Sequence, residues 1–154
     1  MPKTAAELQK GDTRKKKSKK LSKHIKNKQS FSSNRLQISL RTVGDMALKR
    51  RAKRIVEALK LHEGDKILEV GCGNGYYLSL LNRLGIKISL TGIDNNKAAL
   101  FDAKRFIADE SVTLIFADAT KLPFKNNSFN KIICSEVIEH VKDDKKVLQE
   151  IYRV

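Results

Sequence analysis

The sequence predicts an α/β fold built on a doubly wound parallel sheet, and three observations support this class. Apolar segments of strand length alternate with amphipathic, helix-length segments from about residue 65 onward. A glycine-rich turn follows the first strand segment and leads directly into a leucine-rich helix. The later strand segments are followed by polar or acidic residues, at the sheet edge where such folds bind ligands.

Composition restricts the class of protein further. The chain has 154 residues with a hydrophobic content of 40%, which suits one domain with its own core. No apolar run reaches membrane-spanning length, and residues 1–30 lack the apolar segment of a signal peptide. We therefore expect a cytoplasmic protein without membrane association. The only cysteines, Cys72 and Cys134, show no metal-ligand spacing, so we expect reduced thiols and no metal site.

The net charge of +15 is concentrated in the first part of the chain. Residues 1–60 carry 19 Lys and Arg against 4 Asp and Glu, whereas residues 61–154 carry 13 of each. We expect residues 1–42 to form a disordered basic arm, because like charges at this density resist compaction. Two interpretations stay open for residues 1–60. The segment contacts RNA or another polyanion, or it is a solvated basic segment without a specific partner.

The folded domain is expected over residues 43–154, with a leading helix at 43–60 and a cofactor-binding half at 65–154. The leading helix is predicted from one apolar stripe, which consists of Leu48, Ala52, Ile55, Val56 and Leu59. Basic residues fill its other faces, so the helix should pack its apolar side against the sheet and leave a cationic surface outside.

The first strand and its turn read Ile67-Leu-Glu-Val-Gly-Cys-Gly-Asn-Gly75. Glycine at every second position of the turn permits positive φ and lets a ligand approach the backbone closely. A dinucleotide-binding turn would need glycine at position 76, where Tyr76 stands. The carboxylate of Glu69 would also repel a pyrophosphate, whereas it suits a ligand with an ammonium and a sulfonium. A nicotinamide-dependent dehydrogenase, which would share the fold, is therefore disfavoured.

Acidic residues follow the second and third predicted strands. The second strand, at 86–93, is followed by Asp94, 19 residues beyond the last glycine of the turn. That separation is typical of an acid that accepts both hydroxyls of a ribose, and a role of Asp94 as the cap of the next helix would be compatible with it. The third strand, at 111–116, is followed by Asp118, and the fourth is expected at 129–134.

These features resemble motif I of the class I S-adenosylmethionine-dependent methyltransferases, Glu/Asp-x-Gly-x-Gly-x-Gly, at residues 69–75. Leu122-Pro-Phe124, Asn127-Ser-Phe129 and Ser135-Glu-Val-Ile-Glu-His-Val141 are similar to the type 11 branch of that family. The resemblance implies a Rossmann-like sheet with strand order 3-2-1-4, S-adenosylmethionine as cofactor, and methyl transfer to an acceptor that the sequence does not identify.

The resemblance also implies roles for individual residues. The implied cofactor-binding residues lie in the turn and after the next three strands, and they are Glu69, Gly71, Cys72, Gly73, Asn74, Gly75, Asp94, Asn95, Asp118, Ala119 and Ser135. Among them, Asp94 would hold the ribose, and Asp118 with Ala119 would contact the adenine. His140 and Glu136 are the candidate catalytic groups that would take a proton from the acceptor, the alternative being a structural role for both.

The resemblance covers residues 45–154 and only the first half to two-thirds of the family's domain. We therefore expect a seven-stranded sheet that is truncated after the fourth strand and its following helix. A partner chain could instead complete the sheet, because the fourth strand would otherwise be an open apolar edge. One departure is Asn130, where the branch usually has Asp, and no loss of cofactor binding is expected from it. The alternative function is a non-catalytic cofactor-binding fragment or interaction module that binds RNA or a partner chain through its basic N-terminus.

Overall fold

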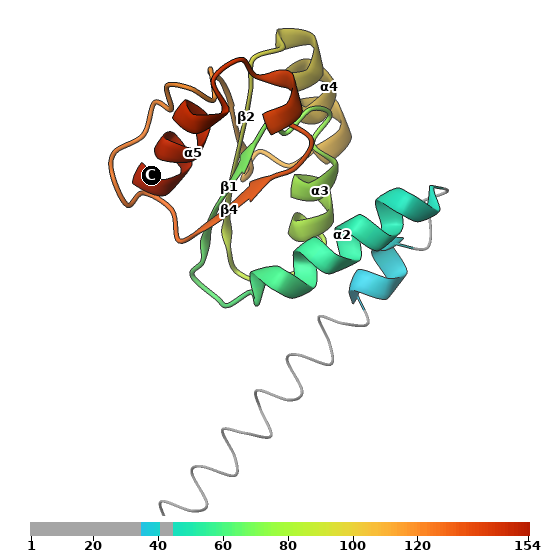
Figure 1. The fold of residues 1–154 in the computed structure, drawn as a ribbon. Helices are drawn as coiled ribbons and strands as arrows, with labels where there is room; N and C mark the ends of the chain where they lie inside the picture. Colours follow the sequence, from blue (N-terminus) through green and yellow to red (C-terminus); the bar gives the residue numbers. More distant parts are fainter. Residues whose placement is uncertain (1–34, 41–44) are drawn as a thin grey trace, which may run out of the picture.

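The computed structural model describes residues 35–40 and 45–154. Its elements follow in the order α2 (Met46–Leu59), β1 (Lys66–Val70), α3 (Tyr76–Asn82), β2 (Ser89–Asp94), α4 (Lys97–Ile107), β3 (Thr113–Phe116), β4 (Lys131–Cys134), the 3-10 turn η1 (Ile138–His140) and α5 (Asp144–Arg153). Strands and helices alternate as the sequence predicts up to β3, and a loop without a helix then leads from β3 to β4 (Figure 1).

The four strands form one parallel sheet in the order β3-β2-β1-β4, which confirms the predicted fold class and strand order. Val70 at the end of β1 pairs with Ile93 of β2 and with Cys134 of β4. Asp94 pairs in turn with Phe116 of β3. All four strands therefore end side by side, and we call the residues that end or directly follow them the carboxyl edge. The chain runs outward from β1 to β2 and β3 and then returns to β4 on the other side of β1, which makes this edge the switch point where open α/β sheets bind ligands.

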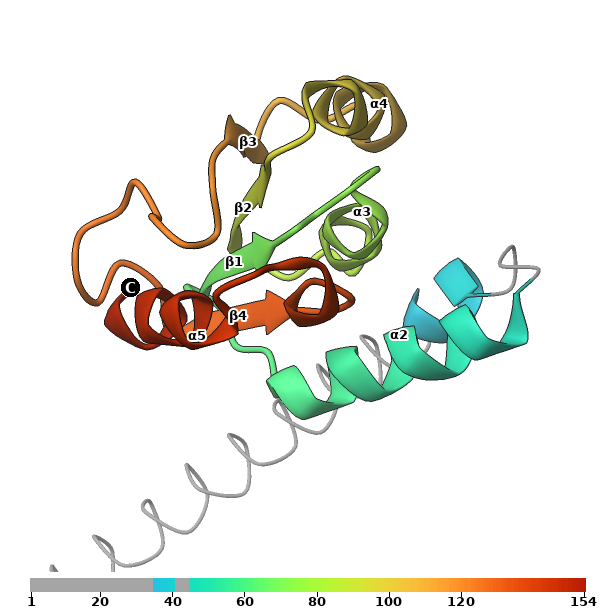
Figure 2. The same cartoon turned by 45° about the horizontal axis from the view of Figure 1, so that its top comes forward.

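Helices cover both faces of the sheet (Figure 2). One core cluster joins α2, α3 and α4 to one face, with Ala52, Leu78 and Ala103 fully buried beside Ile67 of β1. A second cluster joins the end of α5 to the other face, where Val154 packs with Leu68, Val70, Ile93 and Leu122. β1 lies between the two layers, and its last four residues are buried. The carboxyl edge thus stands on a strand that is fixed from both sides.

Helix α2 begins later than the sequence predicts. Asp45 caps it by accepting hydrogen bonds from the backbone N–H groups of Ala47 at 2.7 Å and Leu48 at 3.2 Å, so the helix runs from Met46. The predicted apolar stripe is confirmed, because Ala52 and Val56 are buried against the core. The outer side of α2 carries its basic residues.

The expectation of a disordered arm over residues 1–42 is wrong for residues 35–40, which are helical. Leu36 and Leu40 lie four residues apart, and both are buried in the same core cluster as α2. The hydrophobic side chains at helical spacing therefore outweigh the basic composition around them. The rest of the predicted arm lies outside the described residues, and the division of the chain into an arm and a domain stays a prediction.

Three strands, β2, β3 and β4, begin later in the structure than the sequence predicts. Phe129 donates its backbone N–H to the carbonyl of Val154 at 2.9 Å, so β4 starts only at Lys131. Asn130 joins the starts of β1 and β4, since it accepts from the Lys66 N–H at 2.8 Å and donates to Asp65 at 2.9 Å. β2 starts at Ser89 and β3 at Thr113, where each begins to pair with its neighbouring strand.

Among the described helices, each is too short or too polar to cross a membrane.

Candidate active site

The glycine turn after β1 adopts the backbone conformation that its sequence predicts. Gly71, Gly73 and Gly75 all have positive φ, at 69°, 50° and 77°. A Cβ on Gly75 would lie 2.7 Å from Ile107 Cδ1, so packing against α4 also requires glycine there. A Cβ on Gly73 would meet no atom within 4 Å, so this glycine faces open space. The middle of the turn therefore offers room for a ligand against bare backbone.

Glu69 lies next to this turn in an unusual environment. Its side chain is only 3% exposed, and its Oε2 atom has no hydrogen-bond partner among the described residues. Burial raises the pKa of Glu69 to about 8, and the nearby negative charge of Asp94 adds to the rise, while a hydrogen bond from the Leu78 backbone opposes it. An unpaired carboxylate oxygen in a buried position is costly unless a donor or a cation completes it. The residue therefore fits a cationic ligand group.

Asp94 connects the end of β2 to the glycine turn. Its Oδ2 atom accepts the backbone N–H of Gly73 at 2.8 Å, and its Oδ1 atom accepts that of Asn96 at 2.9 Å. The additional role as a helix cap is wrong, because Asn96 caps α4 by accepting from Ala98 and Ala99. Asp94 thus holds its carboxylate over the turn, with lone pairs left for further donors.

Asp118 and Ala119 follow β3 at the same edge. The Oδ1 atom of Asp118 accepts both the backbone N–H and the hydroxyl of Thr120, each at 2.8 Å. These hydrogen bonds lower the pKa of Asp118, so the residue is held as a carboxylate. Ala119 is half-buried and packs against the core cluster on the α5 face. Asn95, next to Asp94, is exposed.

The segment after β4 brings the two candidate catalytic groups to the carboxyl edge without joining them. Glu136 has a φ of 58°, which is rare for a residue other than glycine, and its Oε1 atom pairs with Nη1 of Arg51 at 3.2 Å. His140 ends η1 and is exposed, and within the described residues its side chain makes no hydrogen bond. Ser135 stands half-buried between β4 and Glu136.

Sequence reasoning missed two residues that shape this segment. Arg51 pairs with Glu136 from a helix 85 positions earlier in the sequence. Val137 packs its side chain onto Gly71, where any Cβ would collide with it. No local pattern signals either contact, because each joins segments that lie far apart in the sequence. Together they connect α2 to the glycine turn through the segment after β4.

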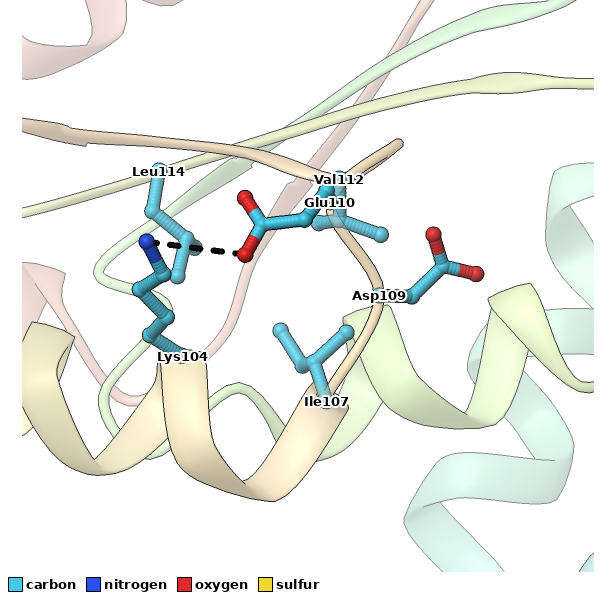
Figure 3. A pocket seen from close by; sticks show the side chains of 6 residues that line it. All are labelled: Lys104, Ile107, Asp109, Glu110, Val112 and Leu114. Atoms are coloured by element: carbon cyan, nitrogen blue, oxygen red, sulfur yellow. Dashed lines mark ion pairs between the residues drawn. The ribbon is translucent and has the colours of Figure 1, made fainter.

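A shallow hollow of about 190 Å³ lies elsewhere, at the end of α4 and the start of β3 (Figure 3). Its lining residues are Lys104, Ile107, Asp109, Glu110, Val112 and Leu114. Lys104 and Glu110 form an ion pair of 3.6 Å across it. Because Val112 precedes β3, the hollow lies at the opposite end of that strand from Asp118. It is not part of the carboxyl edge.

Comparison with known proteins agrees with this geometry. The profile of the family described as "Methyltransferase domain" matches residues 68–154. Demethylmenaquinone methyltransferase of Staphylococcus aureus is 34% identical over 104 residues, covering 66% of this chain and 43% of the relative. Cycloartenol-C-24-methyltransferase of Arabidopsis thaliana is 31% identical over 112 residues, covering 70% of this chain and 33% of the relative. The chain therefore spans less than half the length of these relatives.

The fold comparison leads to the same family. Phosphoethanolamine N-methyltransferase 2 of Haemonchus contortus, solved in complex with S-adenosyl-L-methionine, superposes with a TM-score of 0.61 at 26% identity. The superposition covers 68% of this chain and 25% of that chain. Since the family profile covers more than half of the residues, from within β1 to the end of α5, the chain belongs to the methyltransferase domain family.

Proposed function

We propose that the chain binds S-adenosylmethionine at the carboxyl edge and that the site serves methyl transfer. The observation that carries this proposal is the buried, unpaired Glu69 oxygen beside the open space at Gly73. A cationic ligand that lies on bare backbone satisfies both features at once. An anionic ligand would be repelled by the Glu69 carboxylate, and a neutral ligand could supply a donor but no opposite charge, whereas an ammonium supplies both.

The chain's own residues divide the work of holding the ligand. Glu69 receives the ammonium group, and Asp94 receives the ribose hydroxyls with the lone pairs that Gly73 and Asn96 leave free. Asp118 and Ala119, which follow β3 at the same edge, contact the adenine. The remaining predicted cofactor-binding residues line the turn and the neighbouring strand ends, and they are Gly71, Cys72, Asn74, Gly75, Asn95 and Ser135. The bound cofactor supplies a methyl group that is already activated by a sulfonium.

His140 is the better placed of the two candidate catalytic groups. Glu136 already has a partner, because its carboxylate forms an ion pair of 3.2 Å with Arg51. His140 is exposed at the end of η1, within reach of a ligand that approaches from solvent. We propose that His140 takes the proton of an acceptor that must lose one, and that Glu136 mainly positions the segment after β4.

The proposal is tested by calorimetric titration of the full chain with S-adenosylhomocysteine, alone and as two matched variants. We expect binding near one site per chain, and loss of binding in Gly73→Leu, because its side chain fills the open space. Gly64→Leu is the control, since Gly64 also has positive φ, at 88°, and also faces open space, but it precedes β1 at the other end of the strand. Circular dichroism verifies that both variants are folded.

Unchanged affinity in a folded Gly73→Leu variant would overturn the assignment of the turn. Equal loss in the Gly64→Leu variant would show that the effect is one of folding. No binding by the folded wild-type chain would favour the second candidate function, an interaction module without catalysis.

That second candidate is supported by the surface of α2, whose outer side carries several uncompensated basic residues. Such a module would bind RNA, another polyanion or a partner chain through residues 1–60, or pair with a second chain at the free edge of β4. The names of the two relatives point to different acceptors, so similarity does not select one for this chain. The cytoplasmic location stays a prediction.

A further inference from the structure

We propose that α2 is a docking surface for single-stranded RNA, and that RNA held there presents a nucleotide to the carboxyl edge. This inference rests on the proposed function, because it names the class of acceptor for the same site. The surface consists of Arg50, Arg51, Lys53 and Arg54, which we call the α2 cation cluster. All four side chains are exposed.

Half of the α2 cation cluster is uncompensated, because Arg51 pairs with Glu136 and Lys53 with Glu57, while Arg50 and Arg54 remain. Glu57 is the one acidic residue within α2, and it pairs with Lys53 at 3.9 Å. Arg50 and Arg54 lie one helical turn apart, and within the described residues neither forms an ion pair. Two adjacent guanidinium groups without a carboxylate attract phosphates and recognise them through paired hydrogen bonds. The balance of the sequence agrees, because the whole excess of positive charge lies in residues 1–60.

The α2 cation cluster is continuous with the carboxyl edge. Arg51 belongs to the cluster and contacts Glu136, two residues after the end of β4. In Figure 2, α2 runs along the molecule on the side of β4, away from α4 and β3. Val137, next to Glu136, packs on Gly71 of the glycine turn. A series of direct contacts therefore leads from the cation cluster to the proposed cofactor site.

The α2 cation cluster is positive and the carboxyl edge is negative, so the phosphates and the bases of an RNA ligand are expected to bind at different surfaces. Asp94, Asp118, Glu136 and Glu139 all stand in the segments that end or follow strands at the carboxyl edge. These carboxylates repel phosphates and leave the backbone of the RNA on α2. An uncharged base meets no such repulsion and can reach the edge when it is not stacked in a duplex. Single-stranded RNA fits this division better than duplex RNA.

A membrane surface fits α2 less well than RNA does. A helix that binds a bilayer needs an apolar face to insert beneath the headgroups. In α2 that face is already used, because Ala52 and Val56 are buried against the core. Its cations are therefore available for phosphate contacts without an accompanying apolar anchor.

The first test compares two charge-reversal variants of the full chain for binding of a labelled oligouridylate across a series of salt concentrations. Arg50→Glu/Arg54→Glu should weaken binding by about tenfold or more. It should also reduce the slope of log affinity against log salt by about 1.4, because each phosphate that a cation neutralises adds roughly 0.7 to that slope. Lys87→Glu/Lys125→Glu is the control, with the same change in net charge at exposed positions outside α2. Its slope should change by less than half as much.

The second test measures the affinity for the same oligouridylate with and without saturating S-adenosylhomocysteine. The contacts from Arg51 to Gly71 predict that the two ligands change each other's affinity by at least about threefold. Arg51→Ala should remove this dependence while leaving the affinity for S-adenosylhomocysteine alone within about twofold. This readout separates a coupled site from a basic surface that only attracts RNA.

Either of two outcomes overturns the inference. The first is that both charge-reversal variants bind oligouridylate equally weakly, and the second is that saturating S-adenosylhomocysteine does not change the affinity for oligouridylate. Loss of binding to phosphatidylserine vesicles, but not to oligouridylate, in the Arg50→Glu/Arg54→Glu variant would also overturn it and assign the surface to membranes. If the chain binds no S-adenosylhomocysteine, the proposed function fails instead. The comparison of the two charge-reversal variants then still decides whether α2 binds RNA.

Discussion

Two neighbouring parts of the carboxyl edge are built in different ways. The turn after β1 stands on the buried residues Cys72 and Gly75 and is fixed by contacts with α4 and with Asp94, and its conformation follows from its glycines. The segment after β4 is exposed, and it is held by one ion pair and by the packing of Val137 on Gly71. The first part is fixed before any ligand arrives, whereas the second depends on a few surface contacts.

The difference matches two tasks. A site that always holds the same cofactor gains from a rigid, buried frame, because less ordering is needed on binding. A site that must admit and release an acceptor gains from a surface that opens easily. Glu136 fits a surface that opens easily. Its left-handed backbone is a strained conformation that lasts only while the surrounding contacts maintain it. The predictions below test whether the buried part carries the large effects and the exposed part the small ones.

The largest expected effect is the pH dependence of stability from Glu69. Burial raises its pKa from the ordinary 4.5 to about 8, so the folded chain binds more protons than the unfolded chain between these pH values. The free energy of unfolding should therefore fall as pH rises from 5 to 8, by on the order of 4 kcal/mol. Urea unfolding at several pH values measures this, and Glu69→Gln should show a much weaker decline.

The control for this prediction is Glu110→Gln, an exposed carboxylate far from the carboxyl edge, which should decline like the wild type. Ligand affinity gives a second readout, because only ionised Glu69 attracts an ammonium. The affinity for S-adenosylhomocysteine should rise roughly eightfold between pH 7 and 8.5, as the competent fraction grows. A parallel rise in Glu69→Gln would show that another group is responsible.

The second prediction compares two glycines with positive φ. Gly75→Ala and Gly64→Ala both place a side chain in the left-handed region, which destabilises by about 1–2 kcal/mol. At Gly75 the new Cβ also lies 2.7 Å from Ile107, whereas at Gly64 it meets nothing within 4 Å. Gly75→Ala should therefore lose about 1–3 kcal/mol more in chemical unfolding. Equal losses would mean that the packing of the turn on α4 is loose.

The same contrast explains what could be predicted from the sequence. The alternation of strands and helices and the positive φ of the glycine turn were predicted from short-range patterns of apolar residues and glycines, whereas the strand order was predicted only through the resemblance to a known family. The roles of Asp94 and Glu69 need the fold as well, since their contacts join residues that the sheet brings together. Arg51 with Glu136 could not be predicted, because surface ion pairs between distant segments leave no local pattern. Leu36 and Leu40 had the right spacing, but the basic residues around them obscured it.

The smallest expected effect comes from the pair Arg51 and Glu136. Both side chains are largely exposed, at 43% and 60%, so a double-mutant cycle with Arg51→Ala and Glu136→Ala should give a coupling of about 0.2–1 kcal/mol. Glu136→Gly removes the ion pair but relieves the left-handed strain, so it should be more stable than Glu136→Ala by up to about 1 kcal/mol. None of these variants should change the affinity for S-adenosylhomocysteine by more than about twofold, because the glycine turn is fixed mainly by α4 and Asp94. A coupling well above 1 kcal/mol, or a large loss of affinity, would show that the exposed segment is part of the rigid frame and that the two parts of the carboxyl edge act as one.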